Sequence, residues 1–237
     1  MIPITQPYMP PLDDYVKLLE RIWETKMLSN FAHHAEELER MCGAYLGVGT
    51  RVVSSGDVGL TCAIAALELP RGTHALVPAF TFNSTINAVL WNGLVPTFVD
   101  IDPDTLNMDP AAAARAAVSV DPSLIIATHC FGNPADADGL RRVATEHSAK
   151  LLFDAAHGYG SMRAGLHVGR LADVEVFSLS GTKPVTTAEG GLVTSADAEY
   201  LERFTYTRAY GFQTDYNSRY IGLNGKMSEF HAALGLL

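Results

Sequence analysis

The sequence predicts an α/β protein with a mostly parallel sheet flanked by helices. Short apolar runs alternate with amphipathic stretches over residues 51–195, and this alternation is typical of successive βα units. About seven of the runs have the length and composition of strands. The chain of 237 residues is long enough for one large domain with a substantial core.

The expected elements follow one another in a regular order. Apolar residues at helical spacing predict a first helix over 12–27 and a second over 35–45. Strands are expected at 51–55, 74–80, 94–101, 123–131, 150–154, 174–180 and 190–195. Helices are expected at 58–69, 83–91, 111–118 and 136–148. A last helix opens at Ser228, and its apolar pattern still continues at Leu237, so we expect the full-length protein to extend further.

Composition opposes several classes of function. A formal net charge of -9, with scattered Lys and Arg residues, opposes binding to nucleic acid. No run is apolar for long enough to cross a membrane, and the N-terminus lacks the features of a secretory signal, so we expect a cytoplasmic protein. The three cysteines are widely spaced and form no CxxC pair, which predicts reduced thiols and no metal site.

Four of the five lysines lie on a helix face or at the start of an expected element, which explains their presence. Lys183 is the exception. It lies in SLSGTKPVTTAEGG, a loop rich in Ser, Thr and Gly between two expected strands. A loop lysine is most often a solvated charge, so its neighbours in the fold decide whether it has a chemical role.

Asp154 directly follows the apolar run LLF. We therefore expect its side chain at the carboxyl end of a strand, where open α/β sheets bind their ligands. A carboxylate in that place can keep a pyridine nitrogen protonated, which makes the ring of pyridoxal 5'-phosphate (PLP) an electron sink. The alternative is an aspartate that only caps the segment after the strand.

Two further segments at strand ends carry suitable groups. In SSGD, residues 54–57, the amides of Gly56 and Asp57 open a helix N-terminus that suits a phosphate. A tight turn with Asp57 as the helix cap explains the same letters. In PAFTF, Phe82 is placed to stack on a cofactor ring, although most such aromatic residues are simply core.

In order and spacing, these segments resemble the DegT/DnrJ/EryC1/StrS family of PLP-dependent sugar aminotransferases. The resemblance is carried by SSGDVGL, VPAFTFNSTINAVLWNGLVPTFVDIDPDTLNMDP, THCFGNPADADGL, LLFDAAHGYG, FSLSGTKPVTTAEGG and IGLNGKMSEFHAALGL. It implies the large domain of a type I PLP-dependent transferase at 31–237, preceded by a helical segment at 1–30, with the family's small C-terminal domain absent. The WNG, HCFGNPAD and TAEGG variants are most similar to the branch that aminates C4 of nucleoside-diphosphate 4-keto-6-deoxy sugars.

The resemblance also implies a role for each candidate residue. Lys183 forms the internal aldimine with PLP and shuttles a proton, while Asp154 pairs with the pyridine nitrogen. Phe82 stacks on the ring. His157 contacts the phenolic oxygen, at a position where many members have Gln. The Gly56 and Asp57 amides and Ser178 contact the phosphate. Asn224 reaches the phosphate bound in the other subunit of a homodimer.

The implied reaction is a ping-pong transfer of an amino group. The amino donor is an amino acid, expected to be glutamate, and the acceptor is a keto-sugar nucleotide. Asp57 departs from the family, which commonly has Thr there. Because a carboxylate beside a phosphate dianion is repulsive, we expect Asp57 to turn away as a helix cap while the backbone amides still donate.

Two alternative functions stay open from the sequence. A truncated, non-catalytic homologue that acts as a partner subunit is consistent with Asp57 and with the missing small domain. A nicotinamide-dependent sugar oxidoreductase is consistent with the βα rhythm, but the glycines of GYG and GAYLGVG lack the GxGxxG spacing. A related branch that dehydrates its sugar carries His at the aldimine position, so Lys183 argues against it.

Overall fold

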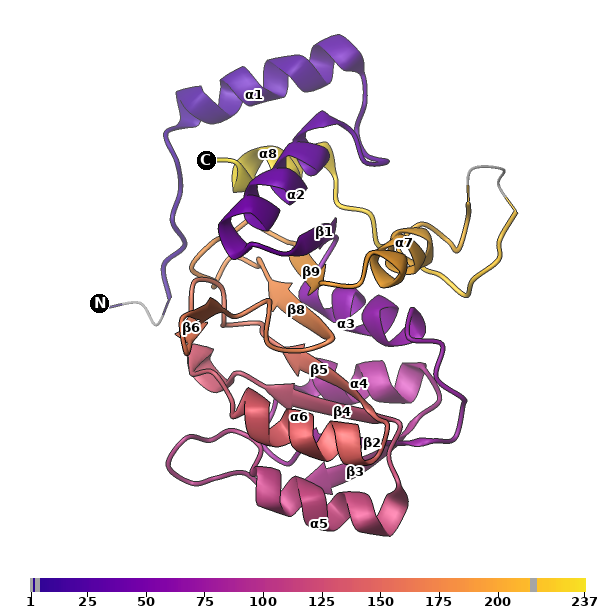
Figure 1. The fold of residues 1–237 in the computed structure, drawn as a ribbon. Coiled ribbons are helices and arrows are strands. Elements are labelled where there is room, and N and C mark those ends of the chain that lie inside the picture. The colour runs from indigo at the N-terminus through magenta and orange to yellow at the C-terminus, as the bar shows by residue number, and fades with distance from the viewer. Residues whose placement is uncertain (1, 3–4, 214–216) are drawn as a thin grey trace.

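Seven short apolar runs pair into one sheet that divides the molecule into layers (Figure 1). The computed structural model describes Ile2 and residues 5–213 and 217–237. In sheet order the strands are β1 (Gly49–Val53), β9 (Gly191–Ser195), β8 (Val174–Ser178), β5 (Lys150–Asp154), β4 (Leu124–Thr128), β2 (His74–Pro78) and β3 (Val95–Val99). β9 runs antiparallel to both of its neighbours, and the other pairings are parallel. The predicted seven-stranded, mostly parallel sheet is confirmed.

Helices cover both faces of the sheet. They are α1 (Leu12–Thr25), α2 (His33–Leu46), α3 (Gly56–Ala65), α4 (Asn83–Trp91), α5 (Pro110–Val120), α6 (Ala137–Glu146), α7 (Ala198–Thr207) and α8 (Glu229–Gly235). The helix α7 and a small hairpin of β6 (Met162–Arg163) and β7 (Leu166–His167) are absent from the sequence-based expectation. The expected strand at 123–131 was too long, because the chain leaves the sheet after Thr128 and turns through the 3₁₀ segment Cys130–Gly132.

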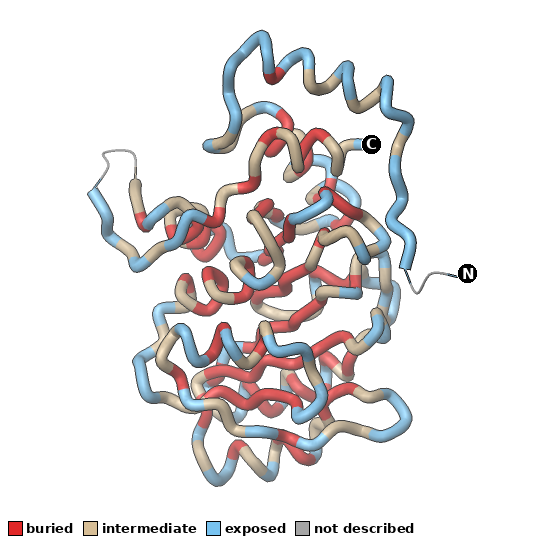
Figure 2. The backbone as a smooth tube through the Cα atoms, turned by 180° about the vertical axis from the view of Figure 1, so that it is seen from behind, coloured by how far each residue is buried: buried red, intermediate tan, exposed pale blue. Residues whose placement is uncertain are grey.

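Side chains of successive residues in a strand point to opposite faces of the sheet, so each face has its own hydrophobic core. On one face α3, α4 and α7 pack on the sheet, and on the other face α5 and α6 cover one part while α2 and α8 cover the rest. The buried strands form the centre of the molecule, whereas α1 is largely exposed (Figure 2). α1 contacts α8 through Tyr15, whose hydroxyl donates to the Phe230 carbonyl at 3.0 Å. No helix in the described part of the chain is long and apolar enough to cross a bilayer.

The antiparallel pairing of β8 with β9 decides where the loop at 179–190 lies. β8 ends at Ser178 beside Gly191, the first residue of β9. The loop between them therefore lies at the carboxyl end of β8, which is also the end of the parallel strand β5 that carries Asp154. Two backbone bonds close the base of the loop, from Leu179 N–H to Gly190 O (2.8 Å) and from Thr187 N–H to Leu179 O (2.9 Å).

A fully buried glutamate fixes the loop that leads into β8. Glu175 has no exposed surface, and its carboxylate accepts hydrogen bonds from the amides of Gly169 (2.7 Å), Leu171 and Ala172 (3.1 Å). The Nε2 atom of His129 lies 3.4 Å from the same carboxylate. Because buried amides need acceptors, this one side chain holds together the loop at 167–173 and the end of β4.

Glu175→Gln is expected to destabilise the protein by about 3 kcal/mol, because an amide side chain loses acceptor capacity toward several buried N–H groups. Urea unfolding followed by circular dichroism measures this change. Glu146→Gln, at the exposed end of α6, is the matched control and is expected to change stability by less than about 0.5 kcal/mol. Equal unfolding midpoints for the two variants would contradict the structural role of Glu175.

Candidate functional site

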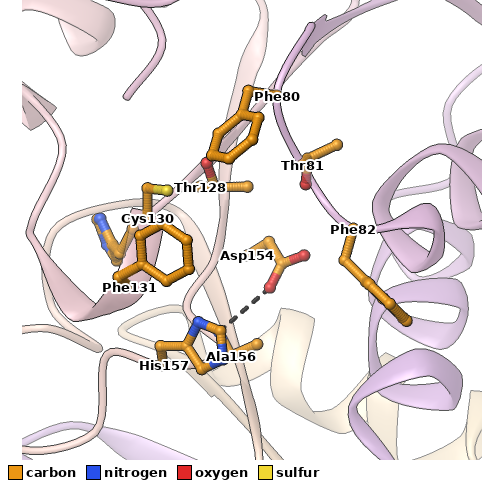
Figure 3. A pocket seen from close by; sticks show the side chains of 10 residues that line it. Phe80, Thr81, Phe82, Thr128, Cys130, Phe131, Asp154, Ala156 and His157 are labelled. Carbon is orange, nitrogen blue, oxygen red and sulfur yellow. Dashed lines mark hydrogen bonds between the residues drawn. The ribbon is translucent and has the colours of Figure 1, made fainter. Parts of the chain in front are cut away.

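The carboxyl ends of the central strands and the N-termini of α3 and α4 enclose one cavity of about 460 Å³. Seven of the eight predicted site residues line it, namely Gly56, Asp57, Phe82, Asp154, His157, Ser178 and Lys183. A second hollow of about 250 Å³ adjoins it and shares Phe82, Asp154 and His157 (Figure 3). These residues come from five separate segments of the chain, so the fold rather than sequence proximity brings them together.

Asp154 is the last residue of β5, and its carboxylate is almost completely buried. The Thr85 hydroxyl donates to Oδ2 at 2.6 Å, and the Ala156 amide donates to Oδ1 at 3.1 Å (Figure 3 shows the second bond). Burial raises the pKa of the Asp154 carboxyl, while the Thr85 hydroxyl is the strongest of the contacts that lower it. The Ala156 bond shows that the side chain caps the turn that follows the strand, and its burial at the cavity leaves the role toward a ring nitrogen a prediction.

Lys183 and His157 form the second polar pair of the cavity. The Lys183 Nζ lies 2.8 Å from Nε2 of His157. Burial lowers the pKa of the Lys183 ammonium, and burial together with the nearby Lys183 charge lowers the pKa of His157. The arrangement favours a neutral imidazole that accepts from Lys183 and carries its own proton on Nδ1. The His157 side chain is therefore exposed to the cavity and is not a histidine satisfied inside the core.

The turn before α3 presents backbone amides to the cavity. Gly56 and Asp57 are the first two residues of α3, so their N–H groups have no acceptor within the helix. A Cβ on Gly56 would lie 3.1 Å from the Ser178 Cβ, and one on Gly191 would lie 2.9 Å from the Gly56 nitrogen. The turn can approach β8 and β9 this closely only because both positions are glycine.

Asp57 does not cap α3, so that expectation was wrong. The cap is Ser55, whose Oγ accepts from the Val58 amide at 3.1 Å. A serine in the extended conformation before the first helical residue provides the acceptor, and Asp57 then falls inside the first turn with its side chain exposed. Solvent screens an exposed carboxylate, and its charge is favourable at a helix N-terminus.

Aromatic side chains surround the opening of the site. Phe82 immediately precedes α4 and is 77% exposed, so it is not a core residue. On another side, the Phe131 ring lies nearly parallel to the His157 ring, with centroids 6.2 Å apart. Phe80 contacts Phe131 edge-on at 6.3 Å (Figure 3). Phe80 and Phe131 were not predicted as site residues. The signal that could have identified them is that both are aromatic residues that follow the end of a strand.

Asn224 is the predicted site residue that does not line this cavity. It is exposed, and its Oδ1 accepts from Lys226 Nζ at 2.6 Å. Its backbone nevertheless belongs to a segment that contacts the turn before α3, because Gly225 O accepts from the Ser54 amide at 2.8 Å. Sequence reasoning also missed Ser55, Thr85 and Glu189. Of these, Ser55 had a usable signal, because it is a serine three residues before the start of the apolar helix pattern.

No group of three or more His, Cys, Asp or Glu side chains within the described ranges could hold a metal ion. Cys42 and Cys62 are buried and Cys130 is partly buried, and none of the three is disulfide-bonded. Among the side chains that line the larger cavity, Lys183, Asp154 and His157 have pKa values shifted from their ordinary values.

Several known proteins are similar to this chain in sequence and fold. dTDP-4-amino-4,6-dideoxy-D-glucose transaminase of Shigella dysenteriae is 36% identical over 235 residues, covering 99% of this chain and 63% of that protein. The enzyme of the same name from Escherichia coli is 32% identical, covering 100% of this chain and 63% of that protein. The crystal structure of DesI with its TDP-sugar product has a TM-score of 0.90 at 36% identity, covering 98% of this chain and 58% of that chain.

This chain thus spans less than two thirds of the length of these relatives. The sequence pattern of the DegT/DnrJ/EryC1/StrS aminotransferase family matches residues 13–237, which confirms the resemblance noted from the motifs. The chain belongs to the DegT/DnrJ/EryC1/StrS aminotransferase family.

Proposed function

We propose that this chain is the cofactor-binding part of a PLP-dependent aminotransferase that moves an amino group from an amino acid to a keto-sugar nucleotide. The observation that carries the proposal is the single cavity in which Lys183, Asp154 and the first amides of α3 converge. A lysine of lowered pKa, a buried carboxylate and an anion-binding helix end are three different chemical functions. A molecule with an aldehyde, a basic ring nitrogen and a phosphate uses all three.

The residues of the cavity fit PLP, which supplies an electron sink when it is bound. The amides of Gly56 and Asp57 and the Ser178 hydroxyl would hold the phosphate. Asp154 would accept from the ring nitrogen, and Phe82 would stack on the ring. His157 is placed to contact the phenolic oxygen. The exposed Asp57 carboxylate leaves the amides free to donate, so its presence is compatible with the phosphate.

Lys183 has two functions in this proposal. Its amine, made less basic by burial, would attach the cofactor covalently. The same amine would also take up a proton from the substrate carbon as general base and return it as general acid.

The named relatives support a nucleotide sugar as the amino acceptor. Two are named dTDP-4-amino-4,6-dideoxy-D-glucose transaminase, and DesI was crystallised in the presence of its TDP-sugar product. We propose glutamate as the donor and two successive half-reactions at the same lysine. We further propose a homodimer in which Asn224 of one protomer contacts the phosphate held by its partner, since Asn224 lies outside the cavity of its own chain.

Lys183→Ala is expected to eliminate the visible absorption band that PLP develops with the wild-type chain, because no other lysine lines the cavity. Where the complete enzyme is assayed, amine transfer should fall by at least about a hundredfold. Lys150→Ala, at the exposed start of β5, is the control and should keep both properties. An undiminished band in Lys183→Ala would remove the basis of the proposal.

The pH dependence of cofactor attachment tests the state of Lys183. The amine attacks PLP only when neutral, and a lowered pKa makes it neutral at lower pH than a solvated lysine. The rate of band formation should therefore rise with a midpoint below that of free lysine. The negative charge of Asp154 raises the pKa of Lys183, so Asp154→Asn should move the midpoint lower still. A midpoint equal to that of free lysine would contradict this picture.

Mixing two defective variants tests the shared site. Asn224→Ala and Lys183→Ala chains, refolded together, should form mixed dimers that contain one site with both side chains intact. About a quarter of the wild-type capacity to bind PLP through lysine is then expected, measured at a PLP concentration that fills intact sites but not sites that lack the Asn224 side chain. No recovery above the mean of the separate variants would argue against a contribution from the partner subunit.

A further inference from the structure

Within the described residues, the carboxylate of Asp154 has two hydrogen-bond donors, of which one is a side chain. That donor is Thr85, which is completely buried and lies 2.6 Å from Oδ2. The other donor is the Ala156 amide, which belongs to the turn that continues from Asp154 itself. Thr85 is therefore the side-chain contact that fixes the carboxylate from a different element of the fold.

Thr85 lies in the first turn of α4, the helix that Phe82 precedes. Its hydroxyl oxygen is also 2.7 Å from the hydroxyl oxygen of Thr81. An ionised carboxylate only accepts, so Thr85 must give its proton to Asp154 and must itself accept from Thr81. Thr81 therefore donates to Thr85, and Thr85 donates to Asp154. A protonated carboxyl could donate as well as accept, so it would not fix the direction of these two hydrogen bonds.

Several charged or titratable groups face Asp154 from the surrounding elements. His157 follows β5, His129 follows β4, and Lys183 lies on the loop between β8 and β9. Burial raises the pKa of Asp154, and among the opposing contacts the Thr85 hydroxyl acts more strongly than the Ala156 amide or either histidine. A buried carboxylate without such donors tends to become neutral.

We propose that Thr85 is a positioning residue for Asp154, holding the carboxylate ionised and turned toward the ring nitrogen of the cofactor. The part that concerns the cofactor rests on the proposed function. Two accepted bonds, one on each oxygen, fix the plane of the carboxylate and leave a lone pair on each oxygen for a further donor. Because Phe82 precedes the same helix, α4 sets the ring-stacking group and the nitrogen partner together.

The first test uses the protein without cofactor. The ¹³Cγ signal of Asp154 is identified by its loss in Asp154→Asn, and its titration is followed in the wild type, Thr85→Val and Thr85→Ser. Thr85→Val keeps the shape but lacks the hydroxyl, and should raise the pKa of Asp154 by about one unit, a tenfold change in its protonation constant. Thr85→Ser should restore most of the wild-type value.

Thr207→Val is the matched control, because Thr207 is also a buried helical threonine whose hydroxyl donates 2.9 Å to a backbone carbonyl. It should leave the titration of Asp154 unchanged. Should Thr85→Val fail to fold, Thr81→Val removes only the outer donor and should raise the same pKa by a smaller amount. An unaltered titration in a folded Thr85→Val protein, or in Thr81→Val when it is the variant used, overturns the proposal.

The second test adds PLP and measures the visible band against pH. In Thr85→Val the apparent PLP affinity should fall about tenfold, and the loss should grow as the pH decreases, whereas Thr85→Ser should follow the wild type. Failure of the wild-type protein to bind PLP would refute the proposed function, whereas the carboxylate titration would still decide the role of Thr85 independently. A pH-independent loss shared by Thr207→Val would show a merely structural role and would overturn the proposal.

Discussion

The need to keep one buried carboxylate ionised organises this structure. Asp154 lies at the end of a central strand, where burial raises the pKa of its carboxyl. The surrounding elements oppose that tendency with a hydroxyl from α4, an amide from the following turn and two imidazoles. One of these imidazoles, that of His129, lies 3.4 Å from Glu175, whose buried side chain accepts from three amides. The charge at the site thus depends on hydrogen bonds that extend well beyond the cavity.

Much of the fold could be predicted because short apolar runs and amphipathic helices leave clear periodic signals. The seven strands and the helix capped by Ser228 were found in this way. The small β6–β7 hairpin, with strands of only two residues, has no such signal. The strand expected to reach Phe131 stops at Thr128, because Phe131 adopts φ 51°, a left-handed conformation that a side-chain pattern does not reveal.

At the candidate site, the position of segments at strand ends pointed to Asp154, Phe82 and the Gly56–Asp57 turn, whereas the family resemblance supplied His157, Ser178 and Asn224. Seven of the eight predicted site residues share a cavity, since the carboxyl ends of parallel strands meet at one edge of the sheet. The error at Asp57 arose because Ser55 and Asp57 are both good helix caps, and only the backbone angles decide between them. Thr85 was missed because its importance comes from a partner 69 positions away in sequence.

The hydrogen bonds at the base of the loop at 179–190, which carries Lys183, affect how parts of the molecule unfold locally. Leu179 is bonded to Gly190 and Thr187, and both ends of the loop continue into paired strands. Segments that are mostly exposed, such as α1, can separate from the body at low free-energy cost, whereas β8 and β9 are buried on both faces. Amide hydrogens at the loop base therefore exchange with solvent through larger and rarer fluctuations than those of α1. Fraying of the periphery leaves the spacing between Lys183 and Asp154 intact.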